Sequence, residues 1–230
     1  MSRIFTGDNN NALNGNFALG PPGDATYLVW YKTTGAGGPI FQHTEHVPGA
    51  TTILGVYPDF SVSVTNMGGD ARVLESQPDG VWLPAIVRAG SGVKSELINR
   101  SGSMLTPGNY GPIGSDGALF VIGAMSSGGA GFNGKIAHMT KWNAVLNDGQ
   151  VSSLLAGMDP SKVNSSQLEE YWPMVDGSLV GAISGKTLTV AGTVPLDGAD
   201  NPVLYTAAAG SFSPPATHQT IQTTIAHAVV

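Results

Sequence analysis

Residues 131–155, GFNGKIAHMTKWNAVLNDGQVSSLL, combine the signals of a strand and of a short helix. Apolar and polar residues alternate after the glycine-rich turn, which predicts a strand over residues 134–143. Asn147 followed by Gln150 forms a loose capping box, so we expect a helix over residues 147–156. Three apolar residues give this helix a one-sided stripe: Val151, Leu154 and Leu155. A helix this short is not stable alone, so its stripe must lie against a sheet.

The rest of the chain has the pattern of strands joined by tight turns. The 230 residues include 32 Gly and 15 Pro, and only 11% are charged. Apolar or alternating runs predict strands at residues 25–31, 51–57, 60–66, 80–90, 93–100, 117–125, 168–174 and 186–194. Pro84 within one of these runs suggests an edge strand or a bulge. This pattern predicts an all-β, two-sheet antiparallel sandwich.

Four blocks of the sequence, in order, resemble the concanavalin A-like, laminin-G-type jelly-roll domains. These are SRIFTGDNNNAL (2–13), ATYLVWYKTTGAGGPIFQH (25–43), GVWLPAIVRAGSGVKSELINRSG (80–102) and the segment from Leu119 to Pro160 that contains the opening stretch. The resemblance implies two antiparallel sheets, with ligand loops at the rim or concave face. It implies one domain over residues 1–206, followed by a tail over residues 207–230.

Composition argues against several classes of partner. The net charge is −6 with 10 basic residues, whereas nucleic-acid binding requires clustered Lys and Arg. The chain has no Cys, so thiol chemistry and disulfides are excluded. No apolar run reaches the length of about 20 residues that spans a bilayer. The N-terminal residues lack the apolar region of a secretory signal, so we expect synthesis and folding in a host cytoplasm.

The sequence also lacks the patterns of the common hydrolases, so we expect no enzymatic activity. Glycosidases of this fold need carboxylates alternating along one strand, and no such run occurs. Glu169 and Glu170 fall on opposite faces of a predicted strand, where we expect them to face solvent. No G-x-S-x-G motif is present.

Two groups of residues have the composition of metal sites. Asp8, Asn9 and Asn11, together with Asp197 and Asp200, would supply oxygen ligands for Ca²⁺ if the first and last strands are neighbours. The same residues are ordinary turn formers. A second group, His43 and His46 with Glu45 between them, suits a transition metal or a polar loop. We expect His138 to be half-buried and hydrogen-bonded.

The loop over residues 126–134 is a candidate glycan-binding loop. Phe132 would stack on a sugar ring and Asn133 would hydrogen-bond its hydroxyl groups. The alternative is a flexible turn that leads into a core strand.

The C-terminal residues differ in composition from the rest of the chain. From Asn201 to Val230 there is no Asp, Glu, Lys or Arg, and the last residues have high β-propensity. Such a segment would aggregate if left free, so we expect it to dock on its own domain or on a neighbouring chain. The apolar contacts would come from Ile221, Ile225 and Val229.

These features support two functions. The first is a non-enzymatic virion structural protein, a capsid decoration or a head or tail accessory protein, similar to bacteriophage structural proteins with this fold. It would form homo-oligomers, dock on other virion proteins and be exposed outside the cell. The alternative is a lectin-like adhesion module that binds cell-surface glycans, with or without Ca²⁺.

Overall fold

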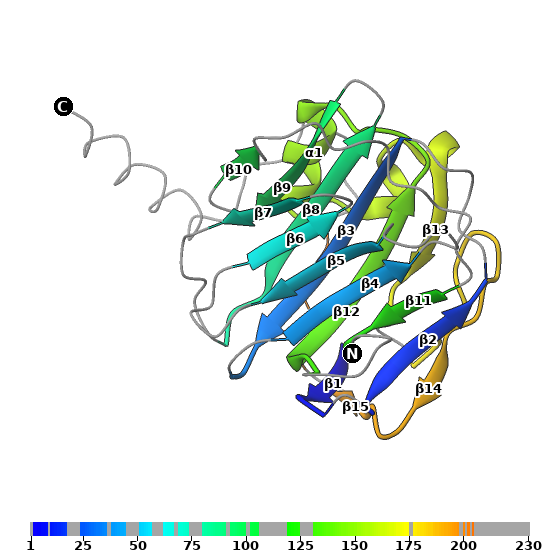
Figure 1. Ribbon diagram of the computed structural model, residues 1–230. Coiled ribbons are helices and arrows are strands. Elements are labelled where there is room, and N and C mark those ends of the chain that lie inside the picture. The colour runs from blue at the N-terminus through cyan, green and yellow to red at the C-terminus, as the bar shows by residue number, and fades with distance from the viewer. Residues whose placement is uncertain are drawn as a thin grey trace.

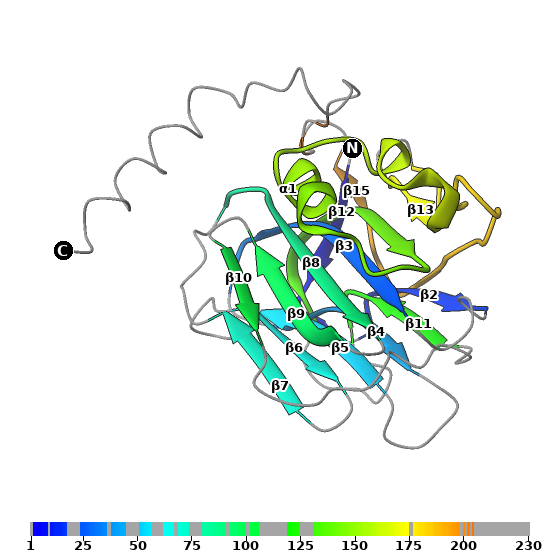
Figure 2. The same ribbon diagram turned by 90° about the horizontal axis from the view of Figure 1, so that it is seen from above.

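Strands dominate the computed structural model. It describes residues 2–8, 10–17, 24–35, 38–44, 51–56, 62–66, 69–73, 80–90, 93–99, 102–105, 119–124, 131–174 and 177–197, with residues 200, 202 and 204. The strands form two sheets that stack face to face (Figures 1 and 2), and every pairing between the described strands is antiparallel. The predicted two-sheet antiparallel sandwich is therefore confirmed.

The larger sheet, called sheet A, has eight strands. In spatial order they are β10 (Gly102–Leu105), β9 (Val93–Asn99), β8 (Leu83–Gly90), β3 (Ala25–Thr33), β12 (Asn133–Trp142), β1 (Ser2–Thr6) and β15 (Leu196–Asp197). The eighth strand, β13 (Leu168–Trp172), also pairs with β12. Strand β1 pairs with the first half of β12 and β13 with the second half, so they share one edge of it.

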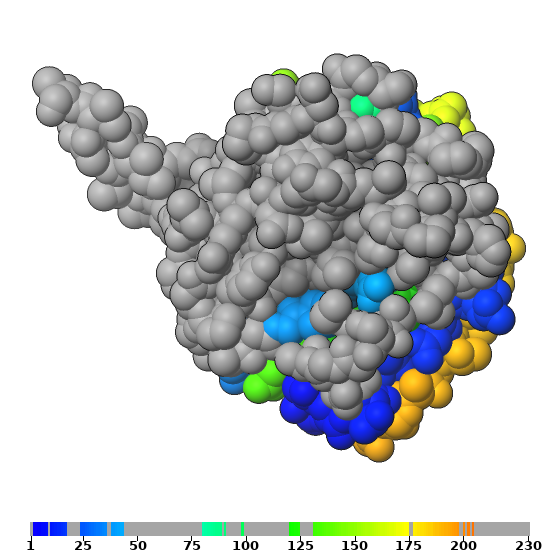
Figure 3. Space-filling view, viewed as in Figure 1, coloured from blue at the N-terminus to red at the C-terminus, as the bar shows by residue number. Residues whose placement is uncertain are grey.

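The second sheet, called sheet B, has seven strands. Their order is β14 (Thr189–Ala191), β2 (Ala12–Asn16), β11 (Leu119–Ile122), β4 (Gly38–Thr44), β5 (Thr51–Val56), β6 (Val62–Asn66) and β7 (Gly69–Val73). The pairing of β14 with β2 brings the late chain beside the early chain. In Figure 3 the orange atoms of the late segment accordingly border the blue atoms of the N-terminal region.

Strand β3 is apolar on both sides because each of its faces is covered. Tyr27, Val29 and Tyr31 point between the sheets and belong to the main core. Leu28 and Trp30 point outward and belong to a second apolar cluster that includes residues of the helix. Burying each such side chain stabilises the fold by about 1.5–3 kcal/mol.

The helix α1 (Asp148–Leu155) confirms the prediction made from the opening stretch. Its N-cap Asn147 and Gln150 form both hydrogen bonds of a capping box. Gly157 adopts a φ of +94°, and the amides of Gly157 and Met158 donate to Leu154 and Ser153, which is a Schellman ending. Val151 and Leu154 are buried against the outer face of sheet A, where α1 lies in Figure 2.

Pro84 differs from its prediction as an edge residue. Strand β8 lies inside sheet A, between β3 and β9. The described pairing with β9 begins at Ala85 and Asn99, so Pro84 lies just outside that ladder and its missing N–H interrupts none of the bonds there.

Several predictions lie outside the described residues. These include the tail over 207–230 with Ile221, Ile225 and Val229, and also Asn9, Glu45 and His46. Among the described helices, none is long and apolar enough to cross a bilayer.

Candidate functional site

Three neighbouring strands place polar side chains on the outer face of sheet A, at the end away from α1. Tyr31 and Ile136 are paired across β3 and β12 and point into the core between the sheets. Side chains alternate along a strand, so the adjacent pair, Lys32 and Lys135, points outward. Thr34 and Asn133 lie two positions further toward this end than Lys32 and Lys135, so they also point outward. We call this region the sheet-end surface, comprising Thr6, Lys32, Thr34, Trp82, Asn133 and Lys135.

Asn133 is held in place within the sheet-end surface. It pairs with Thr6 of β1 across the sheet. The hydroxyl of Thr34 donates to its Oδ1 at 3.2 Å, and the amide of Thr34 donates to its backbone oxygen at 3.2 Å. Gly35 allows this approach, because a Cβ there would lie 2.5 Å from the Asn133 Nδ2 atom. The Asn133 amide is therefore presented in one orientation.

Asp200 connects three residues of the sheet-end surface: Lys32, Trp82 and Lys135. Its Oδ2 accepts from Lys32 Nζ at 2.9 Å and from Lys135 Nζ at 2.5 Å. Its Oδ1 accepts from Trp82 Nε1 at 2.8 Å, and its backbone oxygen accepts from the Ser2 hydroxyl at 2.6 Å. Four separate parts of the chain thus converge on one residue.

These contacts change the ionisation of the residues involved. Burial by itself would raise the pKa of Asp200, but the hydrogen bonds from Lys135, Lys32 and Trp82 outweigh it and hold the pKa well below its usual range. Hydrogen bonds to Asp197 and Asp200 raise the pKa of Lys135. Asp200 is therefore a carboxylate, and Lys135 a cation, across the physiological pH range.

Of the predicted glycan loop over residues 126–134, the structure describes residues 131–134. Phe132 is 1% exposed and packs in the main core, edge-on to Phe5 and Tyr31. Its ring offers no face to a sugar, so the prediction for Phe132 is wrong, because the loop turns inward one residue before β12. Asn133 lies at the surface as described above.

The four predicted calcium ligands that the structure describes, Asp8, Asn11, Asp197 and Asp200, are not brought together at one place. Asp197 pairs with Ser2 at one end of β1, whereas Asp8 follows Thr6 at the other end. Asp8 accepts from the backbone and side chain of Asn10 at 2.9 and 3.0 Å, and Asn11 accepts from the Thr193 amide at 2.7 Å. The described residues contain no cluster of three or more His, Cys, Asp or Glu that would hold a metal ion.

The two described strand histidines are buried beside tyrosines. The Nδ1 atom of His43 lies 2.6 Å from the Tyr27 hydroxyl, between the sheets. The Nδ1 atom of His138 lies 2.6 Å from the Tyr171 hydroxyl, and the two rings stack. His138 is hydrogen-bonded as predicted but more deeply buried, at 5% exposed, and this burial lowers its pKa to about 4.

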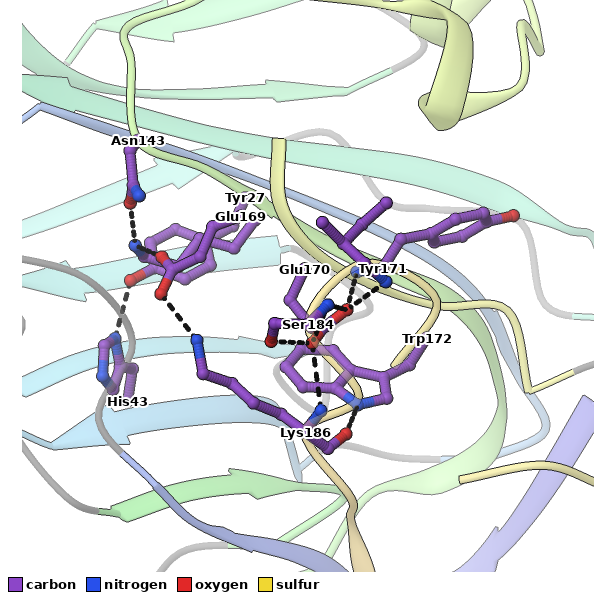
Figure 4. A network of polar contacts seen from close by, with 11 residues as sticks. Tyr27, His43, Asn143, Glu169, Glu170, Tyr171, Trp172, Ser184 and Lys186 are labelled. Atoms are coloured by element: carbon purple, nitrogen blue, oxygen red, sulfur yellow. Dashed lines mark hydrogen bonds and ion pairs between the residues drawn. The ribbon is translucent and has the colours of Figure 1, made fainter. Parts of the chain in front are cut away.

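A network of buried charges lies at the opposite end of sheet A (Figure 4). Lys141, 1% exposed, contacts the Glu169 carboxylate and donates to Asn143 Oδ1 at 2.6 Å. Lys186 donates to the other oxygen of Glu169 at 3.1 Å. The expectation that Glu169 faces solvent is wrong, because it neutralises a lysine that the strand register forces inward.

Glu170 is also buried and organises a loop. It accepts from the amides of Ile183 and Lys186 at 2.9 and 3.2 Å, and from the Ser184 hydroxyl at 2.5 Å. The prediction of a solvent-facing Glu170 is therefore wrong as well. Each of these two carboxylates is fixed by cations or amides, which is the geometry of a structural network rather than of an acid–base pair.

Sequence reasoning missed both the Asp200 contacts and the buried network. The residues around Asp200 come from positions 2, 32, 82, 135 and 200, and no local spacing connects them. The buried network becomes recognisable from the pairing of Lys141 with the core residue Tyr27, which places this lysine between the sheets.

Comparison with models of protein families and with curated proteins gives no match. Solved structures do match. A putative carbohydrate-binding protein from Bacteroides ovatus has a TM-score of 0.65 at 18% identity, over 88% of this chain and 60% of that one. A heptameric SAP-like pentraxin from Limulus polyphemus has a TM-score of 0.57 at 18% identity, over 84% and 93%.

A third similar structure is the CBM40 module of the Ruminococcus gnavus IT-sialidase, bound to α2,3-sialyllactose. Its TM-score is 0.51 at 14% identity, over 67% of this chain and 97% of that one. At these identities the similarity establishes the fold alone, a two-sheet antiparallel jelly-roll sandwich. This chain spans 60% of the first of these structures and nearly all of the other two.

Proposed function

We propose that this protein is a carbohydrate-binding module and that the sheet-end surface is its binding site. The observation that carries the proposal is the combination on one surface of a half-buried Trp82, a fixed Asn133 amide and the Thr6 and Thr34 hydroxyls. Two of the similar structures are described as carbohydrate-binding. This supports the lectin-like function over the virion role.

The chemistry of these groups suits a sugar. An asparagine amide both donates and accepts, so it can bond two neighbouring hydroxyl groups at once. The indole of Trp82 adds apolar area with a polar edge, which is the usual character of a ligand surface that is wet on one side. Because Thr6 and Asn133 lie on the paired strands β1 and β12, little of their conformational entropy is lost on binding.

The test is a glycan array with and without EDTA, followed by titration of the best glycan with Asn133→Ala. We expect binding by the native protein and a loss of about tenfold with the variant, since one well-placed hydrogen-bonding side chain contributes about 1–2 kcal/mol. Asn16→Ala, an exposed asparagine on β2 of sheet B, is the matched control. Failure to bind any glycan would sink the proposal, and loss of binding in EDTA would support the predicted Ca²⁺ dependence.

The virion role remains a prediction. It rests on the low charge, the absence of a secretory signal and of alternating carboxylates, and the uncharged tail over residues 207–230, which lies outside the described residues.

A further inference from the structure

Lys32, Lys135 and Trp82 all donate hydrogen bonds to one carboxylate, that of Asp200. Two ammonium groups reach one oxygen, at 2.9 and 2.5 Å, and the indole N–H reaches the other at 2.8 Å. We call these three donors the carboxylate clamp. Lys32 lies on β3 and Lys135 on β12, which pair in sheet A, and Trp82 directly precedes β8.

The carboxylate in the clamp comes from an irregular segment, whereas two of its donors lie on strands. Asp200 follows the two-residue edge strand β15 and is itself outside any helix or strand. Besides the clamp, its contact with sheet A is the hydrogen bond from the Ser2 hydroxyl to its backbone oxygen. Four residues further on, Leu204 packs against the apolar cluster under α1. Asp200 thus lies over the three donors of the clamp.

We infer that the carboxylate clamp is a binding site for the carboxylate of an acidic sugar, and that Asp200 is an internal occupant that such a ligand displaces. This inference rests on the proposed function and names its ligand class. A carboxylate matches the clamp because charge-assisted hydrogen bonds are stronger than neutral ones. A neutral hydroxyl in place of Asp200 would leave Lys32 without this counter-charge, whereas Lys135 also pairs with Asp197 at 2.5 Å.

The clamp lies close enough to Asn133 and Thr34 for one ligand to contact all of them. Lys135 and Lys32 lie two residues along their strands from Asn133 and Thr34, which is about 7 Å at the usual rise per residue. A sugar ring over Asn133 and Thr34 would therefore place its carboxylate near the clamp. Because Asp200 is tethered, it competes as a local ligand and reduces the apparent affinity for an external carboxylate.

The experiment compares native protein with Asp200→Ala, using calorimetry with glucuronate and with glucose, which lacks the carboxylate. We expect Asp200→Ala to bind glucuronate at least about tenfold more tightly than the native protein, with no gain for glucose. Adding Lys32→Gln should remove the gain. Asp148→Ala is the charge-matched control, because it deletes an 88% exposed carboxylate paired with Arg88 at 2.6 Å elsewhere on the molecule.

A second, milder variant tests the inference if Asp200→Ala does not fold. Ser2→Ala removes only the hydrogen bond to the Asp200 backbone and should give a smaller gain of the same kind. Equal glucuronate affinity in native protein, Asp200→Ala and Ser2→Ala would overturn the inference, as would an equal gain in Asp148→Ala. If the array shows binding but no variant gains, the inference fails and the proposed function stands. If the array is blank but Asp200→Ala gains glucuronate, the clamp stands and the glycan function fails.

Discussion

His138 has an unusual backbone conformation that buries its ring, and this burial makes the stability of the protein depend on pH. It adopts a φ of +52° at the point where the register between β12 and β3 shifts, which is a conformation that few non-glycine residues adopt. The shift turns its ring into a buried contact with Tyr171. An uncharged imidazole is the form that this environment favours.

The pH dependence of stability follows from the lowered pKa of His138. In the unfolded chain the imidazole takes up a proton below about pH 6.5, whereas in the folded protein it does so only near pH 4. The free energy of unfolding should therefore decrease as the pH falls from 6.5 to 4, by up to about 3 kcal/mol, and then level off with respect to this group. Chemical denaturation at several pH values measures this decrease.

His138→Asn is the matching variant, because asparagine tolerates the left-handed backbone and does not titrate. It should be less stable than the native protein at pH 7 but lose less stability on acidification. The same slope in both proteins would show that His138 is not responsible.

At the scale of elements, one buried carboxylate holds the loop after β13. Glu170 is 0% exposed and receives the amides of Ile183, Ser184 and Lys186. We expect Glu170→Gln to destabilise the protein by about 3 kcal/mol, because the new amide turns an N–H group toward buried donors. Denaturation measures the loss. Hydrogen exchange should show loss of protection at residues 183–186, while loss of protection spread evenly over β3 and β12 would contradict this role.

The helix and the sandwich could be predicted from sequence because their signals are local. Asn147, Gln150 and the apolar stripe of α1 lie within a few residues of one another, and a capping box has few other uses. The contacts around Asp200 could not be predicted, since Lys32, Lys135 and Asp200 become neighbours only through strand order. Phe132 was misassigned because an aromatic residue beside glycines fits both a ligand loop and a core strand.

At the scale of the whole molecule, the described contacts extend to Leu204, and the domain boundary near residue 206 stays a prediction. We expect a chain ending at residue 206 to retain its unfolding free energy within about 0.5 kcal/mol. A chain ending at residue 199 should lose about 1–3 kcal/mol, because it lacks Asp200 and Leu204. Thermal and chemical unfolding distinguish the two.

The same truncation tests the predicted docking tail. If residues 207–230 mediate assembly, the chain ending at residue 206 should be a monomer by light scattering where the full chain is an oligomer. An unchanged oligomeric state would count against the docking role.

The position of β1 in sheet A has a consequence for synthesis. Its partners are β12, which begins at Asn133, and β15, which begins at Leu196. At a ribosomal rate of about 5–20 residues per second, the first strand must wait on the order of ten seconds before its earliest partner is made. During that time Phe5, a core residue of the finished protein, has neither strand beside it. Strand β1 thus leaves the ribosome well before either of its partners and is among the last strands to enter sheet A.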